Sequence, residues 1–163
     1  MSLLRSSNAA MNPYLTGTLT KIKMVLPVGK KQAWNLIATS NGMKSWLLKD
    51  CVGDFEQRKP LVFTWPEGAR ENARVVYVGE KHSSLQLDRE NRSRLRFYLH
   101  GRMTTLTLEV EYRLCDNPDK LQASELTTWA FGLANLKSVA LGGRSLLNGM
   151  HGRTRSKRFI DSF

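Results

Sequence analysis

Short stretches of alternating hydrophobic and polar residues run along most of this chain, and stretches with helical spacing interrupt them. A period of two is typical of a strand with one buried face, and Leu19–Leu26 shows it with lysines between apolar positions. Val28–Thr39 then changes to apolar positions at helical spacing. Ser40 can cap a second short helix that runs through Trp46 and Leu47. The pattern therefore predicts a strand followed by two helices.

A long β region follows, in which glycine, proline and charged clusters separate the candidate strands. The clearest strand is the last one, where apolar residues alternate regularly with threonine, glutamate and arginine. One of its faces is expected in the core and the other in water. The predicted strands are Lys49–Glu56, Pro60–Trp65, Asn72–Glu80, Ser83–Asp88, Arg94–His100 and Thr105–Cys115.

The chain then returns to a helical period, with apolar residues recurring from Leu126 to Ala140. Two starts fit this helix, because Asp119 and Ser124 each supply a side-chain oxygen for the free amides of a first turn. Gly142 and the glycine after it are expected to end the helix, since glycine readily takes the left-handed conformation found there. This is the longest helix that the sequence predicts.

The predicted order is one strand, two helices, about six strands and one long helix, with short connections that favour antiparallel neighbours. It predicts an α+β fold in which an antiparallel sheet of about six or seven strands curves round the long C-terminal helix, which alone can cover its apolar face. The space between sheet and helix is the expected ligand site. The domain is predicted over residues 17–143, between a disordered leader at 1–16 and a basic, disordered tail at 144–163.

The composition is that of a globular protein, with 163 residues, 41% of them hydrophobic and 24% charged. No uninterrupted apolar run approaches the roughly 20 residues that span a bilayer. Cys51 and Cys115 fall in separate predicted strands and match neither a zinc site nor a disulfide framework, so we expect buried thiols. The first residues, Met1–Pro13, lack the apolar stretch of a signal peptide, which predicts a cytoplasmic location.

The titratable residues form no pattern of catalysis or metal binding. The three histidines are His82, His100 and His151. They lack the spacing of metal ligands, such as two histidines one helical turn apart. Asp50, Asp54 and Glu56 alternate along a predicted strand, and acidic residues at this period usually form its solvated face. We therefore expect no catalytic residue, no metal and no cofactor. An enzyme stays open as a third class of function, after a binding module and a nucleic-acid or acidic-partner binder, because no group of residues supports a named reaction.

Three stretches resemble one known family. Leu36–Leu47, which reads LIATSNGMKSWL, and Thr104–Leu108, which reads TTLTL, are similar to a helix-turn segment and to a late strand of that family. Trp129–Lys137, which reads WAFGLANLK, is similar to its last helix. Together with the order of elements, they resemble the START-like superfamily, also called SRPBCC. Within it, the chain resembles stand-alone bacterial-type members of the family of activators of heat-shock protein 90 ATPase.

This resemblance implies a helix-grip fold, also described as Bet v-like, with a hydrophobic cavity between the sheet and the last helix. A small apolar molecule is the implied ligand. Full-length eukaryotic activators also carry an amino-terminal domain that contacts the chaperone, and 163 residues leave no room for it beside the predicted domain. A chaperone or another protein client is therefore an alternative partner, with the precise role unassigned.

Large apolar residues on the predicted strands and last helix are the candidates for lining such a cavity. Core packing explains most of them equally well, since large apolar side chains fill protein interiors. We expect ligand-binding contacts from the side chains that alternate on strands, from one on the second helix and from two spaced by one turn on the last helix. These are Trp46, Phe63, Trp65, Phe97, Trp129 and Leu133.

Basic residues raise a different function, because the net charge is +11. Arg92, Arg94 and Arg96 are predicted to project from one face of a strand as a basic surface. A nucleic acid or an acidic partner is the implied ligand, although the stripe lacks the exposed aromatic residues on which bases stack. A solvated outer face explains the stripe as well.

Overall fold

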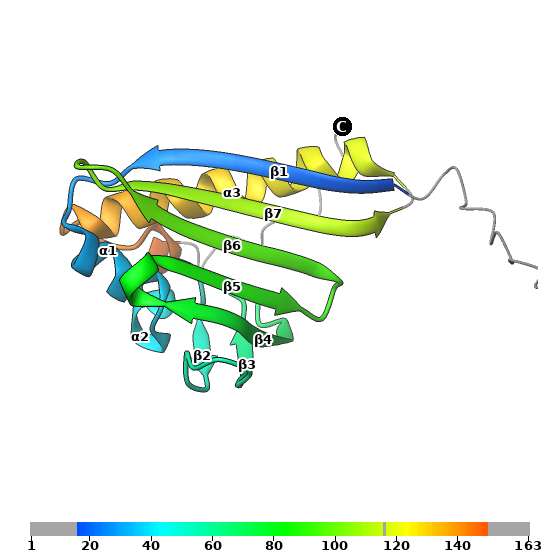
Figure 1. The fold of residues 1–163 in the computed structure, drawn as a ribbon, viewed down its shortest axis with the longest axis horizontal. Helices are drawn as coiled ribbons and strands as arrows, with labels where there is room; N and C mark the ends of the chain where they lie inside the picture. Colours follow the sequence, from blue (N-terminus) through cyan, green and yellow to red (C-terminus); the bar gives the residue numbers. More distant parts are fainter. Residues whose placement is uncertain (1–15, 116, 150–163) are drawn as a thin grey trace, which may run out of the picture.

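The computed structural model describes residues 16–115 and 117–149, so the predicted leader, apart from Thr16, and most of the predicted tail lie outside the described residues. The chain forms an α+β helix-grip fold, a seven-stranded antiparallel sheet with one long helix against it (Figure 1), and the predicted fold class is confirmed. The elements are β1 (Thr16–Val25), α1 (Lys30–Ile37), α2 (Ser40–Trp46), β2 (Asp50–Val52), β3 (Pro60–Thr64), β4 (Arg70–Gly79), β5 (Ser84–Arg89), β6 (Ser93–His100), β7 (Thr105–Cys115) and α3 (Pro118–Ala140). Short 3₁₀ turns, η1 (Glu80–His82) and η2 (Leu146–Gly149), complete the described chain.

The strands follow the order β1-β7-β6-β5-β4-β3-β2. All consecutive strands from β2 to β7 pair as antiparallel neighbours, as short connections favour. The first strand is added beside the last, with Ile22 opposite Leu108 in the register. Because β1 is connected directly to α1, this pairing places the two short helices at one end of the sheet, where they contact α3 (Figure 1).

The two faces of the sheet follow the predicted alternation. We call the face that packs against the helices the inner face and the opposite one the outer face. On β6, Leu95, Phe97 and Leu99 are buried on the inner face, whereas Arg94 and Arg96 lie on the partly exposed outer face. A chain with this period buries one set of side chains and leaves the other in water. The core therefore lies between the inner face and α3.

The junction of α1 and α2 brings two backbones into close contact. Thr39, and not Ser40 as predicted, caps α2: its hydroxyl accepts a hydrogen bond from the Gly42 amide and donates one to the Asn35 carbonyl. Ser40 is instead the first helical residue, and its hydroxyl donates to the Gly53 carbonyl. Gly42 faces the end of α1 so closely that a Cβ there would lie 2.7 Å from the Leu36 Cα. Glycine is the residue that permits this approach.

The long helix begins earlier than either predicted start. Asn117 is the N-cap, with its side-chain oxygen accepting from the Lys120 amide, and Pro118 occupies the first turn. Proline suits that position because the first amides of a helix have no partner within the helix. Asp119 and Ser124 are therefore inside the helix and do not cap it. Its end is as predicted, with Gly142 at a φ of 79° just beyond the last turn.

The second strand is shorter than predicted. It covers only Asp50–Val52, and Gly53 follows with a φ of 119°, which is a left-handed conformation that ends the extended run. Asp54 and Glu56 consequently lie in a loop and do not alternate with Asp50 along one strand. Cys51 on this strand is buried as predicted, and burial raises the pKa of its thiol. The side chain of Cys115 lies outside the described residues. Among the helices of the described chain, none combines the length and apolar content needed to cross a membrane.

Candidate functional site

The six residues predicted to line a ligand cavity all belong to the interface between the inner face and the helices. Five of them are buried, from α2, β3, β6 and α3, and Trp65, just after β3, is half-buried. The buried ones are Trp46, Phe63, Phe97, Trp129 and Leu133. Their common location is as expected, while a role in ligand binding stays a prediction.

Four aromatic rings connect the sheet to the long helix. Phe63 and Trp65 meet edge to face with ring centroids 6.5 Å apart, and Trp65 meets Trp129 in the same way at 6.5 Å. Phe97 also meets Trp129 edge to face, with ring centroids 6.3 Å apart. Such T-shaped pairs place the positive edge of one ring against the negative face of the next. We call Phe63, Trp65, Phe97 and Trp129 the aromatic cluster.

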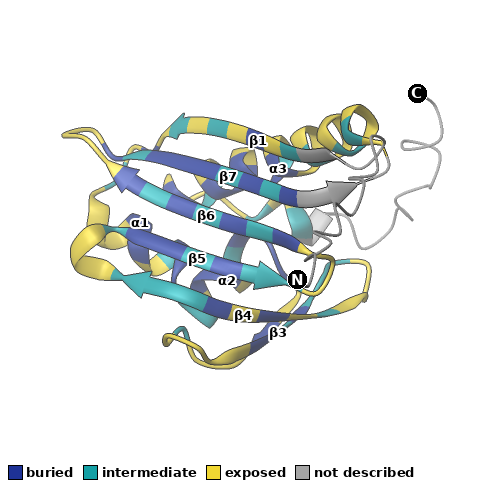
Figure 2. Ribbon diagram, turned by 45° about the vertical axis from the view of Figure 1, so that its right-hand side comes forward, coloured by how far each residue is buried: buried dark blue, intermediate teal, exposed yellow. Residues whose placement is uncertain are grey.

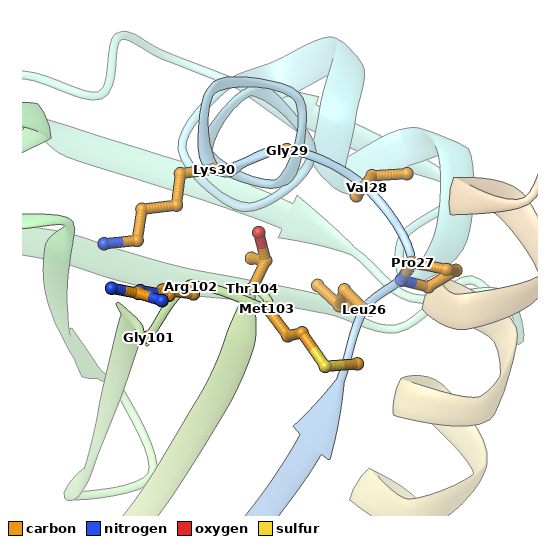
Figure 3. A pocket seen from close by; sticks show the side chains of 9 residues that line it. All are labelled: Leu26, Pro27, Val28, Gly29, Lys30, Gly101, Arg102, Met103 and Thr104. Carbon is orange, nitrogen blue, oxygen red and sulfur yellow. The ribbon is translucent and has the colours of Figure 1, made fainter.

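Two open hollows lie elsewhere on the surface. The first has a volume of about 410 Å³ and is formed by residues 26–30, between β1 and α1, and residues 101–104, between β6 and β7. Figure 3 shows Lys30 and Arg102 at one side of it and Met103 beside Leu26. The second, of about 420 Å³, lies between residues 38–41 and 53–56. Neither hollow is lined by the six residues that the sequence predicted.

A charged pair, not anticipated from the sequence, borders the aromatic cluster. Arg89 at the end of β5 donates two hydrogen bonds to Glu71 on β4, at 2.8 and 3.0 Å. Glu71 also accepts from the Trp65 indole nitrogen at 2.8 Å, and the Arg89 guanidinium lies over the Trp65 ring at 5.4 Å. The side chains of Arg89 and Glu71 are only 9% and 13% exposed. The two charges offset the cost of their desolvation because they are hydrogen-bonded to each other and to their neighbours.

The hydrogen bonds continue from this pair to the long helix. Arg89 donates to Ser93 at 3.3 Å, and Ser93 donates to Asn91 at 2.6 Å. Asn91 then donates to the Tyr112 hydroxyl at 3.1 Å, and Tyr112 donates to Glu125 of α3 at 2.8 Å. The chain ends where the Trp129 indole donates to the other oxygen of Glu125, at 2.7 Å. We call Glu71, Arg89, Asn91, Ser93, Tyr112 and Glu125 the polar network.

The polar network and the aromatic cluster form a closed ring. The network begins at the Trp65 indole and ends at the Trp129 indole, and these two rings touch each other. Since each indole N–H is fixed by a carboxylate, the orientation of both rings is set by polar contacts as well as by packing. A semi-buried set of charged and hydroxyl groups beside apolar rings is the arrangement that orients small ligands in proteins.

The sequence contained a signal for this network. Glu71 is two residues from the buried Ala73 of β4, and Arg89 is two residues from the buried Leu87 of β5, so each charge lies on the inner face of the sheet. A charge at an inward position needs a partner. Strand pairing brings them together, because Arg89 is opposite Ala73. The alternation along each strand shows that each charge points inward, but only the register of β4 and β5 shows that Glu71 and Arg89 meet.

Tyr112 has an unusual acidity in this setting. Burial first, and then the charge of Glu125 and the hydrogen bond to it, raise the pKa of Tyr112 from 10.0 to about 12. Each of these effects disfavours the phenolate, which is the charged form. The phenol is therefore held neutral as a donor to Glu125.

This shift predicts a pH dependence of stability. The unfolded chain releases the tyrosine proton near pH 10.0, before the folded chain does near about 12, so the stabilisation is complete below the first value and is lost between the two. Between about pH 9 and about pH 11, the wild type should lose about 1 kcal/mol more unfolding free energy than Tyr112→Phe. Urea denaturation at both pH values measures the difference, and equal losses in the two proteins would contradict it.

The predicted basic surface is largely neutralised by acidic neighbours on the outer face. Arg94 pairs with Asp88 at 2.6 Å, and Arg96 pairs with Glu109 and Glu111 at 3.7 and 2.5 Å. Arg92 lies outside β6, in the turn before it, with a φ of 66°. The predicted row of three arginines along one strand is therefore wrong in its first position. The two arginines of β6 face acidic residues of β5 and β7, as expected of a solvated face with opposite charges on neighbouring strands.

Other reactive groups of the described chain lie apart. His100 bonds to Thr107 across the sheet, His82 is in η1, and His151 lies outside the described residues. Within residues 16–115 and 117–149, no group of three or more histidine, cysteine, aspartate or glutamate residues could hold a metal ion. The polar network is therefore the main candidate site that the described residues offer.

No family model matches this sequence, and no curated protein is similar to it in sequence. Solved structures share its fold. A protein from Staphylococcus saprophyticus is 16% identical, covering 80% of this chain and 96% of its own, with a TM-score of 0.66. A protein from Mesorhizobium loti is 12% identical, covering 76% and 96%, with a TM-score of 0.66. The Aha1 dimer from Colwellia psychrerythraea is 14% identical, covering 76% and 96%, with a TM-score of 0.63. At these identities the similarity shows the fold alone.

Proposed function

We propose that this domain binds a small, mostly apolar molecule between the inner face of the sheet and α3, without catalysing a reaction. The observation that supports this most is the closed ring of the aromatic cluster and the polar network. A purely structural core is best built from apolar side chains, because ion pairs lose much of their attraction to desolvation. The semi-buried Glu71–Arg89 pair and Glu125 are better explained as groups that orient a ligand at the apolar rings.

We also propose that the chain belongs with the activators of heat-shock protein 90 ATPase in the START-like superfamily. Trp129–Lys137 and Leu36–Leu47 support this, and the chain shares its fold with the Aha1 dimer from Colwellia psychrerythraea. Contact with a chaperone or another protein is the secondary function that this membership suggests. The basic surface gains less support, because Arg94 and Arg96 already have acidic partners.

The binding proposal predicts that two neighbouring residues of β6 behave differently. Phe97 lies in the aromatic cluster, and Tyr98 faces the outer side of the same strand. An uncharged, environment-sensitive dye should bind saturably. Phe97→Leu should raise its dissociation constant at least about fivefold, or by about 1 kcal/mol, because a ring contact is lost. Tyr98→Leu, the matched control, should leave it within about twofold.

Fluorescence titration of the folded proteins measures both constants. Circular dichroism confirms that each variant keeps its fold. Absence of saturable binding by the wild type, or an equal effect of the two substitutions, would count against an interior ligand site.

A further inference from the structure

Glu125 is the carboxylate of the polar network for which the described residues provide no ion-pair partner. It is half-buried on α3, and its two oxygens accept hydrogen bonds from the Tyr112 hydroxyl and the Trp129 indole. Both donors are neutral groups. Among the side chains that the structure describes, no lysine or arginine forms an ion pair with Glu125. Within the described residues, its negative charge therefore has two hydrogen-bond donors and no ion-pair partner.

The cation of the polar network, Arg89, already pairs with the other carboxylate, Glu71. Arg89 makes two hydrogen bonds to Glu71 and a third to Ser93, and its side chain is only 9% exposed. The network therefore holds the carboxylates of Glu71 and Glu125 against one guanidinium, which leaves one negative charge uncompensated. In a partly desolvated place, such a charge attracts a cation and repels an anion more strongly than it does at the surface.

Aromatic rings lie along the polar network, and their faces can also attract a cation. Trp65 and Trp129 lie at the two ends of the network, and Tyr112 lies between Asn91 and Glu125. The faces of such rings are negative and attract ammonium groups within about 6 Å of the centroid. The protein itself uses this attraction, since Arg89 lies over the Trp65 ring at 5.4 Å. At Glu125 itself, the Tyr112 hydroxyl and the Trp129 N–H are directed at the carboxylate, so the carboxylate would hold a ligand cation and the rings would contact the rest of the ligand.

The helix segment that carries Glu125 is the least packed part of α3. None of the residues from 118 to 128 is buried, whereas Trp129, Gly132, Leu133, Asn135, Leu136 and Ala140 are buried in the rest of the helix (Figure 2). This half of the helix is held by the contacts of Glu125, by Leu121, which packs against the core, and by the Gln122 side chain, which donates to the Leu19 carbonyl at 3.2 Å. Segments with few buried apolar contacts open at low free energy. Displacement of this half of the helix would give a ligand access to Glu125.

We infer that the ligand is an apolar amine, whose protonated nitrogen pairs with Glu125 and whose hydrocarbon body contacts the aromatic cluster. This inference rests on the proposed function and adds the class of ligand to it. The ammonium group supplies the missing positive charge, and its N–H donors fit the two carboxylate oxygens. The apolar body gains from leaving water, in proportion to the area that the rings cover.

Three ligands of equal chain length test the inference: decylammonium, decanol and decanoate, each below its micelle concentration. Isothermal titration calorimetry with the full chain should give decylammonium an affinity at least about tenfold higher than that of decanol, with decanoate no tighter than decanol. In Glu125→Gln the preference for the amine should fall below about threefold, while decanol binding stays within about threefold of the wild type.

A matched control separates a local charge from the charge of the whole protein. Asp119 is an exposed acid in the first turn of the same helix, and Asp119→Asn removes one negative charge as Glu125→Gln does. The amine preference should persist in Asp119→Asn. Should Glu125→Gln fail to fold by circular dichroism, Tyr112→Phe serves instead. It leaves the carboxylate with one donor fewer, so the preference for the amine should be at least that of the wild type.

The outcomes distinguish this inference from the proposed function. If none of the three ligands binds the wild type, the proposed function itself fails. If decanol and decanoate bind but decylammonium has no advantage, the binding function stands and the amine assignment is overturned. A preference that survives in Glu125→Gln, disappears in Asp119→Asn, or is lost in Tyr112→Phe overturns the assignment of the nitrogen to Glu125.

Discussion

Replacing Gly42 by alanine is expected to lower the free energy of unfolding by about 3 kcal/mol or more, near the upper end of what overpacking causes. The added Cβ would clash with the Asn35 carbonyl oxygen and lie 2.7 Å from both the Cα and the oxygen of Leu36. All three are backbone atoms, which no side-chain rotation can move away. The turn between α1 and α2 would have to open, and Trp46, whose indole donates to the Leu36 carbonyl at 2.9 Å, would lose its position.

Gly132 provides the matched control for this substitution. It is also a buried helical glycine, but a Cβ there would meet only side-chain atoms, the Leu47 Cδ1 at 3.4 Å and the Trp46 Cζ3 at 3.6 Å. Alanine favours a helix interior by up to about 1 kcal/mol over glycine, so Gly132→Ala should be neutral or slightly stabilising. Urea denaturation of both variants measures the difference. Similar stabilities of the two variants would show that the close approach at Gly42 is relaxed at little cost.

Substitution of Asn135 by alanine is expected to lower the free energy of unfolding by about 3 kcal/mol, because buried groups lose their partners. Asn135 is fully buried on α3, and its amide nitrogen donates to the Trp46 carbonyl and to the Ser145 hydroxyl at 3.1 Å. Its oxygen accepts from the Leu146 amide at 2.7 Å. One side chain thus connects the end of α2, the long helix and the start of η2.

Ser145→Ala is the control for Asn135, because it leaves the contacts of Asn135 with the Trp46 carbonyl and the Leu146 amide in place. It removes the Ser145 hydroxyl, which accepts from the Asn135 amide nitrogen at 3.1 Å and from the Leu147 amide at 3.2 Å. Its expected cost is about 1 to 2 kcal/mol, because each of these two partly exposed hydrogen bonds contributes about 1 kcal/mol or less. Hydrogen exchange gives a second measurement: the Leu146 amide should exchange faster in Asn135→Ala than in Ser145→Ala. Equal stability of the two variants would mean that water replaces the amide without loss.

The elements of this fold were predicted from local patterns because each strand and helix has its own period. The last strand was placed at Thr105–Cys115 from its alternation, and the structure has the same bounds. The errors lie at ends, where one side chain decides. Asn117 caps α3 in place of Asp119, and Gly53 shortens β2, because a cap and a left-handed residue act at single positions that a period does not mark.

The candidate site was predicted only in its apolar part. Phe97 and Trp129 were expected at the interface of sheet and helix because inward periodicity is a property of each segment. The polar network joins residues from β4, β5, β6, β7, α3 and the turn before β6, and the arrangement of strands decides which inward charges meet. The same arrangement places Glu109 and Glu111 beside Arg96, and these acids neutralise much of the surface that the sequence predicted to be basic.

The sequence by itself determined the α+β class, the two faces of each strand and the long C-terminal helix, because the periods of side-chain burial are local and follow backbone geometry. Only the tertiary structure decided which charges are paired. Glu71 meets Arg89 and Tyr112 meets Glu125 across 18 and 13 residues of chain. Electrostatic energy depends on distance and burial in space, which strand register and helix placement set together.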